Sequence, residues 1–223
     1  MKQVADGVWQ LRGFPPDAIN VYLAEDVLID AGSRHAARRI LRQLKEHTVT
    51  AHALTHAHPD HQGSSDEVCG KLGIPFWVGE KDVPYAEDPA RLTEIQSGHP
   101  FTKVGMKYFL GPGRNVDRAL HEGDEIAGFK VMEVPGHSPG HIAFWRDRDG
   151  VLILGDVINN INIVTGMPGL HEPPLFVAFD AEQNRSSARR LAALEPKLML
   201  FGHGRPLRDT RKFTDFVARL SNP

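Results

Sequence analysis

Four side chains that can bind a metal ion lie within six positions of this chain: His56, His58, Asp60 and His61. They follow an apolar-leaning run, 49–54, that is typical of a strand. On an extended chain alternate side chains share a face, so His56 and His58 are expected to point the same way. Pro59 redirects the chain, which lets Asp60 and His61 face a second centre beside the first. Imidazole with carboxylate suits zinc, and less selectively iron, manganese or cobalt.

Polar donors recur where other apolar strands are predicted to end. The chain shows this at four further positions: Asp30, His137, Asp156 and His203. Loops at strand ends are held by a rigid sheet, as a preorganised metal site requires. The strands alternate with helices predicted from Ser33 (as N-cap) to about His47, from Ser64 or Ser65 to about Leu72, over 181–194 and over 209–220. Segment 79–112 predicts short helices and loops, and 157–179 predicts a long apolar loop interrupted by Gly and Pro.

Length and charge restrict the classes of function. The 223 residues fit one domain, 1–223, with enough chain to bury a core without disulfides. A single cysteine, Cys69, excludes an internal disulfide and favours a reducing compartment. The 26 basic and 28 acidic residues nearly cancel, so nucleic acid is not an expected partner. No run has the length of a membrane span and the N-terminus lacks an apolar signal core, which predicts a cytoplasmic protein without membrane contact.

Taken together and in order, the motifs resemble those of the metallo-β-lactamase superfamily, within it the glyoxalase II-like branch. The matching segments are His56-Ala57-His58-Pro59-Asp60-His61, His137 in Pro-Gly-His-Ser-Pro-Gly-His, Gly155-Asp156 and Gly202-His203-Gly204. The strands that lead to Asp30-Ala31-Gly32 look like the superfamily's first strands. The resemblance implies an α/β fold, a four-layer αββα sandwich with two metals at one edge between the sheets.

The resemblance also implies a role for each donor. It assigns one metal to His56, His58 and His137, the other to Asp60, His61 and His203, and the bridging position to Asp156. The cofactors implied are two divalent ions, zinc ahead of iron or manganese. Asp30 would anchor the ligands from behind, and His141 fits such a supporting role better than that of a ligand. His52 and His121 are expected to be structural, and His171 could line a substrate loop.

The implied activity is that of a metal-dependent hydrolase. A hydroxide bound between the two metals would attack a small-molecule thioester, lactone or other activated acyl bond. Asp60 is the donor best placed to orient this hydroxide or pass on its proton. An alternative is an oxidoreductase, similar to persulfide dioxygenases, with one iron held by His56, His137 and Asp156. The complete second-metal set argues against it.

Differences from known branches of the superfamily narrow the range of expected substrates. Only 20 residues follow His203, too few for the helical domain with which glyoxalase II binds glutathione. True β-lactamases of this fold lack the bridging Asp, and lactonases that resemble this motif set place a tyrosine near the metals, which the 157–179 loop does not contain. The apolar character of that loop suggests a hydrophobic acyl group, although a lid packed on the core or a dimer surface explains it equally well. The oligomeric state stays open, a homodimer included.

Overall fold

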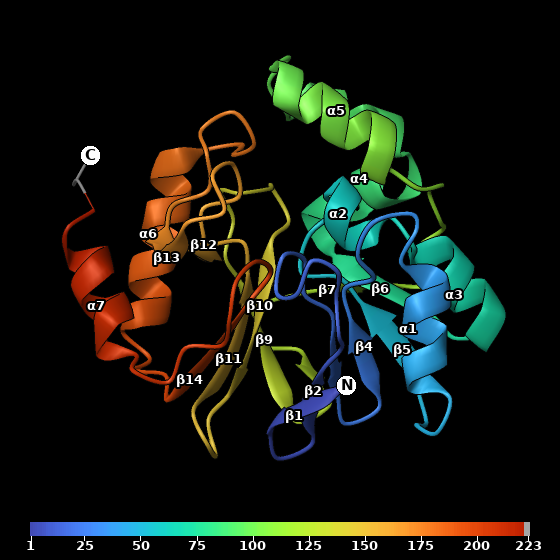
Figure 1. Ribbon diagram of the computed structural model, residues 1–223, viewed down its shortest axis with the longest axis horizontal. Coiled ribbons are helices and arrows are strands. Elements are labelled where there is room, and N and C mark those ends of the chain that lie inside the picture. Colours follow the sequence, from blue (N-terminus) through green and yellow to red (C-terminus); the bar gives the residue numbers. More distant parts are fainter. Residues whose placement is uncertain (221–223) are drawn as a thin grey trace.

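Two sheets face each other in the computed structural model, which describes residues 1–220 (Figure 1). The first sheet has the order β1 (Lys2–Ala5), β2 (Val8–Gln10), β3 (Tyr22–Ala24), β4 (Val27–Ile29), β5 (Ala51–Ala53), β6 (Phe76–Gly79) and β7 (Arg118–Leu120). The second has the order β14 (Leu198–Phe201), β11 (Val151–Gly155), β10 (Ile142–Arg146), β9 (Phe129–Glu133) and β8 (Glu125–Ile126). Strands β4 to β7 pair in parallel, whereas β8 to β11 form an antiparallel meander that β14 joins in parallel.

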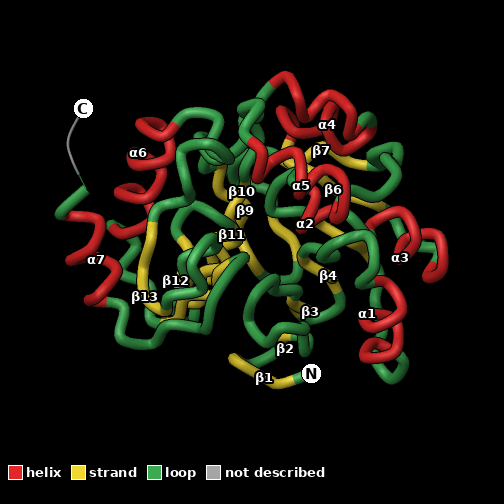
Figure 2. The backbone as a smooth tube through the Cα atoms, turned by 45° about the horizontal axis from the view of Figure 1, so that its top comes forward, coloured by secondary structure: helices red, strands yellow, loops and turns green. Residues whose placement is uncertain are grey.

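Helices cover the outer face of each sheet. On the first sheet lie α1 (Ala37–Leu44) and α3 (Ser65–Leu72), and on the second lie α6 (Ala181–Ala192) and α7 (Arg211–Ala218) (Figure 1). The remaining helical elements lie at one end of the sheets: α2 (Pro59–Gln62), the 3₁₀ turns η1 (Glu80–Asp82) and η2 (Pro89–Glu94), α4 (Val83–Glu87) and α5 (Pro100–Phe109). Helix α5 contacts α2, and the two lie side by side in Figure 2. The layers follow the predicted αββα order.

Both sheets are buried on both faces, and side chains that alternate along each strand pack on the other sheet and on the outer helices in turn. On β11, Val151 and Ile153 point toward the other sheet, while Leu152 and Leu154 pack under the outer helices. On β4, Leu28 faces α1 and its two neighbours face inward. Successive side chains on a strand point to opposite faces, so a sheet covered on both sides needs an unbroken apolar run.

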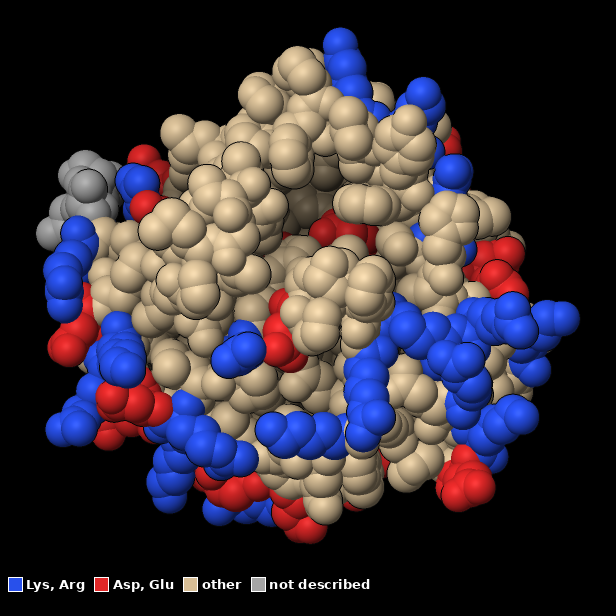
Figure 3. All heavy atoms as spheres, viewed as in Figure 1, with Lys and Arg blue, Asp and Glu red and all other residues tan. Residues whose placement is uncertain are grey.

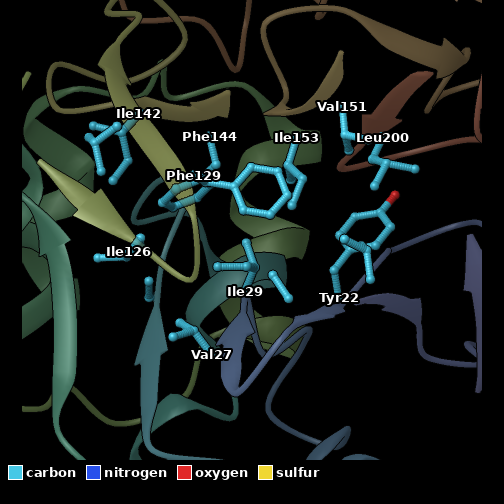
Figure 4. Packing of buried hydrophobic residues seen from close by; sticks show 14 of the residues in the cluster. Tyr22, Val27, Ile29, Ile126, Phe129, Ile142, Phe144, Val151, Ile153 and Leu200 are labelled. Carbon is cyan, nitrogen blue, oxygen red and sulfur yellow. The ribbon is translucent and has the colours of Figure 1, made fainter. Parts of the chain in front are cut away.

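The core between the sheets is closely packed. Phe129 and Phe144 from the second sheet meet Ile29 and Tyr22 from the first (Figure 4). Each of these side chains is no more than 1 % exposed. The Tyr22 hydroxyl donates to the Phe201 carbonyl across the two sheets at 2.8 Å. This core fixes the relative position of the strand ends that carry the candidate donors.

The start of the first helix differs from the prediction. Helix α1 begins at Ala37, and Ser33 does not cap it. The Ser33 carbonyl instead accepts a hydrogen bond from the Ser64 hydroxyl at 2.6 Å and from the Ala36 amide at 2.9 Å. Ser64 occupies the N-cap position of α3 but makes no side-chain cap there. Its hydroxyl links the two helices, so a long-range contact replaces both local caps.

Segment 157–179 is not entirely a loop. It contains a hairpin of β12 (Asn159–Ile161) and β13 (Pro168–His171), with a turn between them. The Asn160 amide donates to the His203 carbonyl at 2.9 Å, which attaches the hairpin to the loop after β14. The remainder, 172–179, is irregular and leads into α6.

Candidate metal centre

The first four candidate donors lie on the loop that follows β5 and on helix α2. His56 and His58 lie on the connecting loop, and their ring centroids are 4.6 Å apart, which agrees with the predicted shared face. His58 is the N-cap residue of α2 and Pro59 occupies its first turn. Proline suits this position because its missing amide would have no partner there. Asp60 and His61 follow on the helix and turn toward a second position.

The other three donors come from the second sheet. His137 lies in the turn between β9 and β10, Asp156 directly follows β11, and His203 lies two residues after the end of β14. Because β11 and β14 are parallel neighbours, their ends deliver Asp156 and His203 to the same edge. The His203 Nε2 atom lies 3.0 Å from Asp156 Oδ2.

All seven predicted donors converge at this edge. In each of three sets, one ligand atom per residue lies within 4.8 Å of the others: His56, His58 and His137; Asp60, His61 and His203; and His56, His61 and Asp156. We name the first set the first donor group and the second set the second donor group. Asp156 Oδ2 lies 3.7 Å from His137 Nε2 and 3.0 Å from His203 Nε2. The carboxylate of Asp156 therefore stands between the two groups.

The first donor group fits a divalent cation. The Nε2 atoms of His56, His58 and His137 are buried and have no hydrogen-bond partner among the described residues, and neither does Oδ1 of Asp156. Buried polar atoms are normally paired, so such a cluster indicates a ligand that accepts their lone pairs. Burial lowers the pKa of His58 to about 4 and holds those of His56 and His137 well below their usual value. Neutral imidazole is the form that binds metals.

The second donor group has the opposite charge character. Burial disfavours a protonated His203, but Asp156 and Asp60 together raise its pKa to about 10. The same carboxylates, with Asp30, raise the pKa of His61 against the effect of its burial. His203 Nε2 lies 3.2 Å from Asp60 Oδ2, and His61 Nε2 lies 3.6 Å from Asp156 Oδ1. A positive charge is thus favoured at the position that a second cation would take.

Asp30 supports this edge from behind, as the sequence predicted. Its Oδ2 atom accepts a hydrogen bond from His61 Nδ1 at 2.9 Å, which directs Nε2 of that ring into the centre. Its Oδ1 atom accepts from the Thr55 amide at 2.8 Å. Asp30 has a φ of +61°, in the left-handed region that Asp tolerates better than most residues. A carboxylate behind a ligand histidine fixes the ring orientation.

Asp82 also supports the centre, and sequence reasoning missed it. Its carboxylate accepts hydrogen bonds from the Ala57 amide at 2.8 Å, from the Ser138 hydroxyl at 2.6 Å and from the Gly140 amide at 2.7 Å. Ala57 separates His56 from His58, and Ser138 follows His137. Asp82 therefore joins the two loops of the first donor group. It lies alone in a weakly patterned segment, and no local sequence signal marks it.

Asn20 was missed as well. Its amide donates to the carbonyls of Phe201 at 2.9 Å and Gly204 at 2.7 Å, on either side of His203. The Ala18 carbonyl accepts a hydrogen bond from His203 Nδ1. The segment before β3 therefore holds the last donor loop in place. A buried Asn between apolar residues was the available signal, since buried amides need specific partners.

The remaining histidines lie outside the donor groups. His141 is buried, with its ring centroid 4.7 Å from that of His56, and burial lowers its pKa to about 3. His52 is a buried residue of β5, where its ring forms a hydrogen bond with the Ser65 hydroxyl and stacks on Phe76. His121 is half exposed near Glu80. His171 lies on β13 and is not among the residues that line the pocket described next.

A pocket opens over the donor groups. Its floor is formed by His58, Asp60, His137, Asp156 and His203, and α5 with the 163–177 segment forms its walls. Figure 3 shows this hollow, with acidic atoms at the bottom and uncharged residues around it. The Asp60 side chain is 23 % exposed and that of Asp156 only 3 %, so Asp60 is the more accessible carboxylate. A small molecule can therefore reach both donor groups from one side.

Comparison with known proteins agrees with this geometry. The model of the metallo-beta-lactamase superfamily matches residues 14–203, which include every predicted donor. The chain belongs to the metallo-beta-lactamase superfamily. The predicted family and fold class are thereby confirmed. Divalent metals are typical of this superfamily, and the His and Asp clusters of the chain suit them.

Relatives in the superfamily carry names of hydrolases. The chain is 30 % identical to the probable metallo-hydrolase YflN of Bacillus subtilis, over 88 % of this chain and 81 % of that protein. It is 28 % identical to a hydroxyacylglutathione hydrolase of Bdellovibrio bacteriovorus, over 78 % of this chain but only 56 % of that enzyme. The chain therefore lies among metallo-hydrolases of the superfamily.

Solved structures of the superfamily share the fold. The BLEG-1 B3 metallo-beta-lactamase is 27 % identical, with a TM-score of 0.65 over 90 % of this chain and 93 % of that one. A di-iron-bound form of TTHA1623 is also 27 % identical, with a TM-score of 0.63 over 97 % and 93 %. Among residues 1–220, no helix combines the length and apolar character that a membrane span needs.

Proposed function

We propose that the chain is a hydrolase that cleaves activated acyl bonds in small molecules, thioesters and lactones in particular, with two divalent ions. The observation that carries this proposal is the convergence of two donor groups on one carboxylate, Asp156, at the floor of an open pocket. Zinc is the proposed metal, ahead of iron or manganese, because neutral imidazoles dominate the first donor group. The di-iron form of one structural relative keeps iron as the second choice.

The donors divide by position. The first donor group would hold one ion and the second donor group the other, and Asp156 would bind between them. When bound, two ions act as Lewis acids on a carbonyl and lower the pKa of a water molecule toward neutrality. Hydrolysis adds the hydroxyl of that water to the acyl carbon and returns its proton to the leaving thiol or alcohol. No oxidant or reductant is consumed.

The chain's own groups position the reactants and move the proton. The floor of the pocket is largely shielded from bulk water, which strengthens electrostatic interactions with the acyl carbonyl. Asp60 is the proposed catalytic residue, because its carboxylate faces the pocket, where it would orient the attacking water or pass on its proton. Asp30, which holds His61, and Asp82, which joins the loops of His56 and His137, keep the donors in place.

Elemental analysis combined with an activity panel tests the proposal. Protein loaded with zinc, iron or manganese would be assayed on thioesters, lactones, β-lactams and phosphodiesters. We expect two metal ions per chain and turnover of thioesters or lactones. One iron per chain with oxygen uptake would support the dioxygenase alternative instead. Two bound metals with cleavage of phosphodiesters alone would overturn the acyl-bond proposal.

Replacing Asp60 tests its role. Asp60→Asn removes the acceptor of the proton and weakens the second donor group, so we expect at least a 100-fold loss of turnover and weaker binding of the second ion. Asp66→Asn changes a half-exposed carboxylate on α3 and serves as the matched control. Unchanged metal content and turnover in Asp60→Asn would defeat this assignment.

A further inference from the structure

The walls of the pocket over the donor groups are made of apolar side chains. Phe101, Val104 and Phe109 line it from α5, and Ile163 and Val177 line it from the opposite segment. Polar atoms are confined to the floor, where the donors lie, and to two residues of the wall, Gln96 and Thr102. A substrate that places its acyl carbon at the floor must therefore lay the rest of its acyl group along an apolar surface.

No Lys or Arg lines this pocket in the described part of the chain. Helix α5 does carry Lys103 and Lys107, but both are exposed and neither belongs to the pocket lining. The Thr102 hydroxyl already donates to its own turn, 2.6 Å from the His99 carbonyl. A carboxylate on the substrate would lose its hydration without gaining a cation, which is costly. The lining therefore selects against anionic acyl groups.

The apolar wall is preformed. Phe176 lies against the rings of His99 and Phe101, at centroid distances of 4.2 and 5.6 Å. The Ser97 hydroxyl donates to the Phe176 carbonyl at 2.8 Å. These contacts join the start of α5 to the 171–179 segment across the pocket. A wall that is already in place adds binding energy without an ordering cost.

Further exposed apolar side chains lie on the part of the chain that also carries the wall residues Ile163 and Val177. On the hairpin and the segment after it, Val164, Met167, Leu175 and Phe179 are 51, 61, 73 and 49 % exposed. Isolated exposed apolar residues are ordinary, but a group beside an apolar pocket indicates a binding surface. An acyl chain longer than the pocket would lie against these side chains.

We propose that the substrate of this chain carries an uncharged, apolar acyl chain that lies between α5 and the 163–177 segment, with its carbonyl at the donor groups. This inference rests on the proposed function, since it names the class of acyl compound that the site would hydrolyse. It separates the chain from enzymes whose acyl substrates carry carboxylates, because such substrates need a cation in the pocket.

A series of acyl thioesters of N-acetylcysteamine tests the inference on the metal-loaded protein. Apolar burial contributes about fourfold in affinity for each methylene, so kcat/KM is expected to rise about fourfold per methylene from butanoyl to octanoyl. Adipoyl, which matches hexanoyl in length but ends in a carboxylate, is expected to be at least tenfold poorer than hexanoyl. Equal rates for acetyl and octanoyl, or adipoyl equal to hexanoyl, would overturn the inference while the hydrolase proposal stands.

A charge placed on the wall should weaken the preference for the uncharged acyl group. Val104→Lys puts a cation on the pocket lining, so we expect it to narrow the hexanoyl-to-adipoyl ratio about fivefold. Tyr108→Lys adds the same charge to α5 outside the lining and is the matched control, expected to change the ratio by less than twofold. An equal effect of both variants would mean that any positive charge on α5 changes the ratio, and it would contradict recognition by the pocket wall.

Direct binding provides a readout that does not depend on turnover. Calorimetry with the uncleavable thioether S-hexyl-N-acetylcysteamine, and with its analogue carrying a terminal carboxylate, is expected to show at least tenfold tighter binding of the neutral compound. Val104→Lys should narrow that difference and Tyr108→Lys should not. If these results hold but no thioester or lactone is cleaved, the proposed hydrolysis fails and the apolar ligand class stands. If the protein binds both compounds with equal affinity, the inference fails whatever the activity.

Discussion

Asp82 joins two loops that carry donors of the first group, through the Ala57 amide, the Ser138 hydroxyl and the Gly140 amide. Burial raises the pKa of Asp82, although these three hydrogen bonds favour its charged form. All three partners are donors, so the group between them must accept. The chain thus uses a buried acceptor, at a cost in desolvation, to fix the distance between His56 and His137.

Asp82→Asn should loosen the first donor group. The introduced NH₂ group would face at least one donor, which leaves buried hydrogen-bonding groups unpaired and costs about 1–3 kcal/mol of stability. We expect zinc affinity to fall about 10- to 100-fold, as for other residues that support ligands. Zinc titration against a competing chelator measures this change, and Asp66→Asn, which alters a half-exposed carboxylate, is the control. Unaltered zinc affinity with lowered stability would leave Asp82 with a structural role only.

His52 predicts a pH dependence of stability that is separate from the metal centre. Its Nδ1 atom lies 3.1 Å from the Leu28 carbonyl and its Nε2 atom 2.8 Å from the Ser65 hydroxyl. Burial lowers its pKa from 6.5 to about 4. The unfolded chain therefore binds a proton at this residue between pH 6.5 and 4 that the folded chain does not, and stability falls as the pH falls through this window. Above the window the contribution is fully present.

The size of this effect follows from the two pKa values. At pH 5 the contribution of His52 to the free energy of unfolding is about 2 kcal/mol smaller than at pH 7. The stability difference between the wild type and His52→Gln, measured by urea unfolding of metal-free protein, should shrink by that amount between these pH values. Taking the difference between the wild type and the variant removes the contributions of the other titrating groups, which the two proteins share. His121→Gln, at a half-exposed histidine outside the core, is the control. A difference for His52→Gln that does not change with pH would refute this account.

At the scale of elements, the loop after β14 shows how closely backbone and donors are packed. A Cβ atom at Gly202 would overlap Asp156 Oδ1 and lie 2.8 Å from His61 Cε1. Gly202→Ala should therefore displace the carboxylate between the two donor groups and lower metal content below two ions per chain. Gly70→Ala is the matched control, because nothing lies within 4 Å of its Cβ position on α3. The control should stabilise the helix by about 0.5–1 kcal/mol.

Elemental analysis decides this prediction. A Gly202→Ala protein with the full metal content would show that Asp156 can shift without loss of the centre. A folded variant with reduced metal content is the expected result, and circular dichroism separates it from a variant that fails to fold.

Much of the fold could be predicted because local patterns matched tertiary structure. Continuous apolar runs such as 151–154 and 198–201 are buried on both faces, and their ends were predicted correctly within a few residues. The first helix was predicted, but it starts later than expected, because the Ser33 carbonyl binds Ser64 and Ser33 does not cap the helix. The β12–β13 hairpin was not predicted, because Pro168 and Gly169 fall within β13, β12 has only three residues, and the pairing has an irregular register.

The candidate site was predictable to the extent that its donors form short motifs. The sequence predicted seven candidate donors, and the structure brings their ligand atoms together. It did not reveal Asp82 or Asn20, because each acts on loops far away in the chain, which no local pattern identifies. The apolar pocket wall depends on how α5 sits across from 163–177, which no local pattern specifies.

At the scale of the whole molecule, the centre lies where the two halves of the fold meet. The loop and helix that follow β5 of the first sheet carry His56, His58, Asp60 and His61, and the strand ends of the second sheet carry His137, Asp156 and His203. Each donor group therefore draws on both sheets. Ions bound there would link the halves in addition to the core between the sheets (Figure 4).

Metal removal should then lower thermal stability. A ligand that binds only the folded state at 1,000 times its Kd stabilises it by about 4 kcal/mol, which for a chain of this length is about 8–16 °C in Tm. We expect chelator-treated protein to unfold that much earlier than zinc-loaded protein in calorimetry. His137→Asn should lose part of the shift, because it removes the donor that the second sheet gives to the first donor group, whereas His121→Asn should keep it. Equal Tm values with and without zinc would mean that the sheets are held by their core alone, and that the convergence of donors does not serve metal binding.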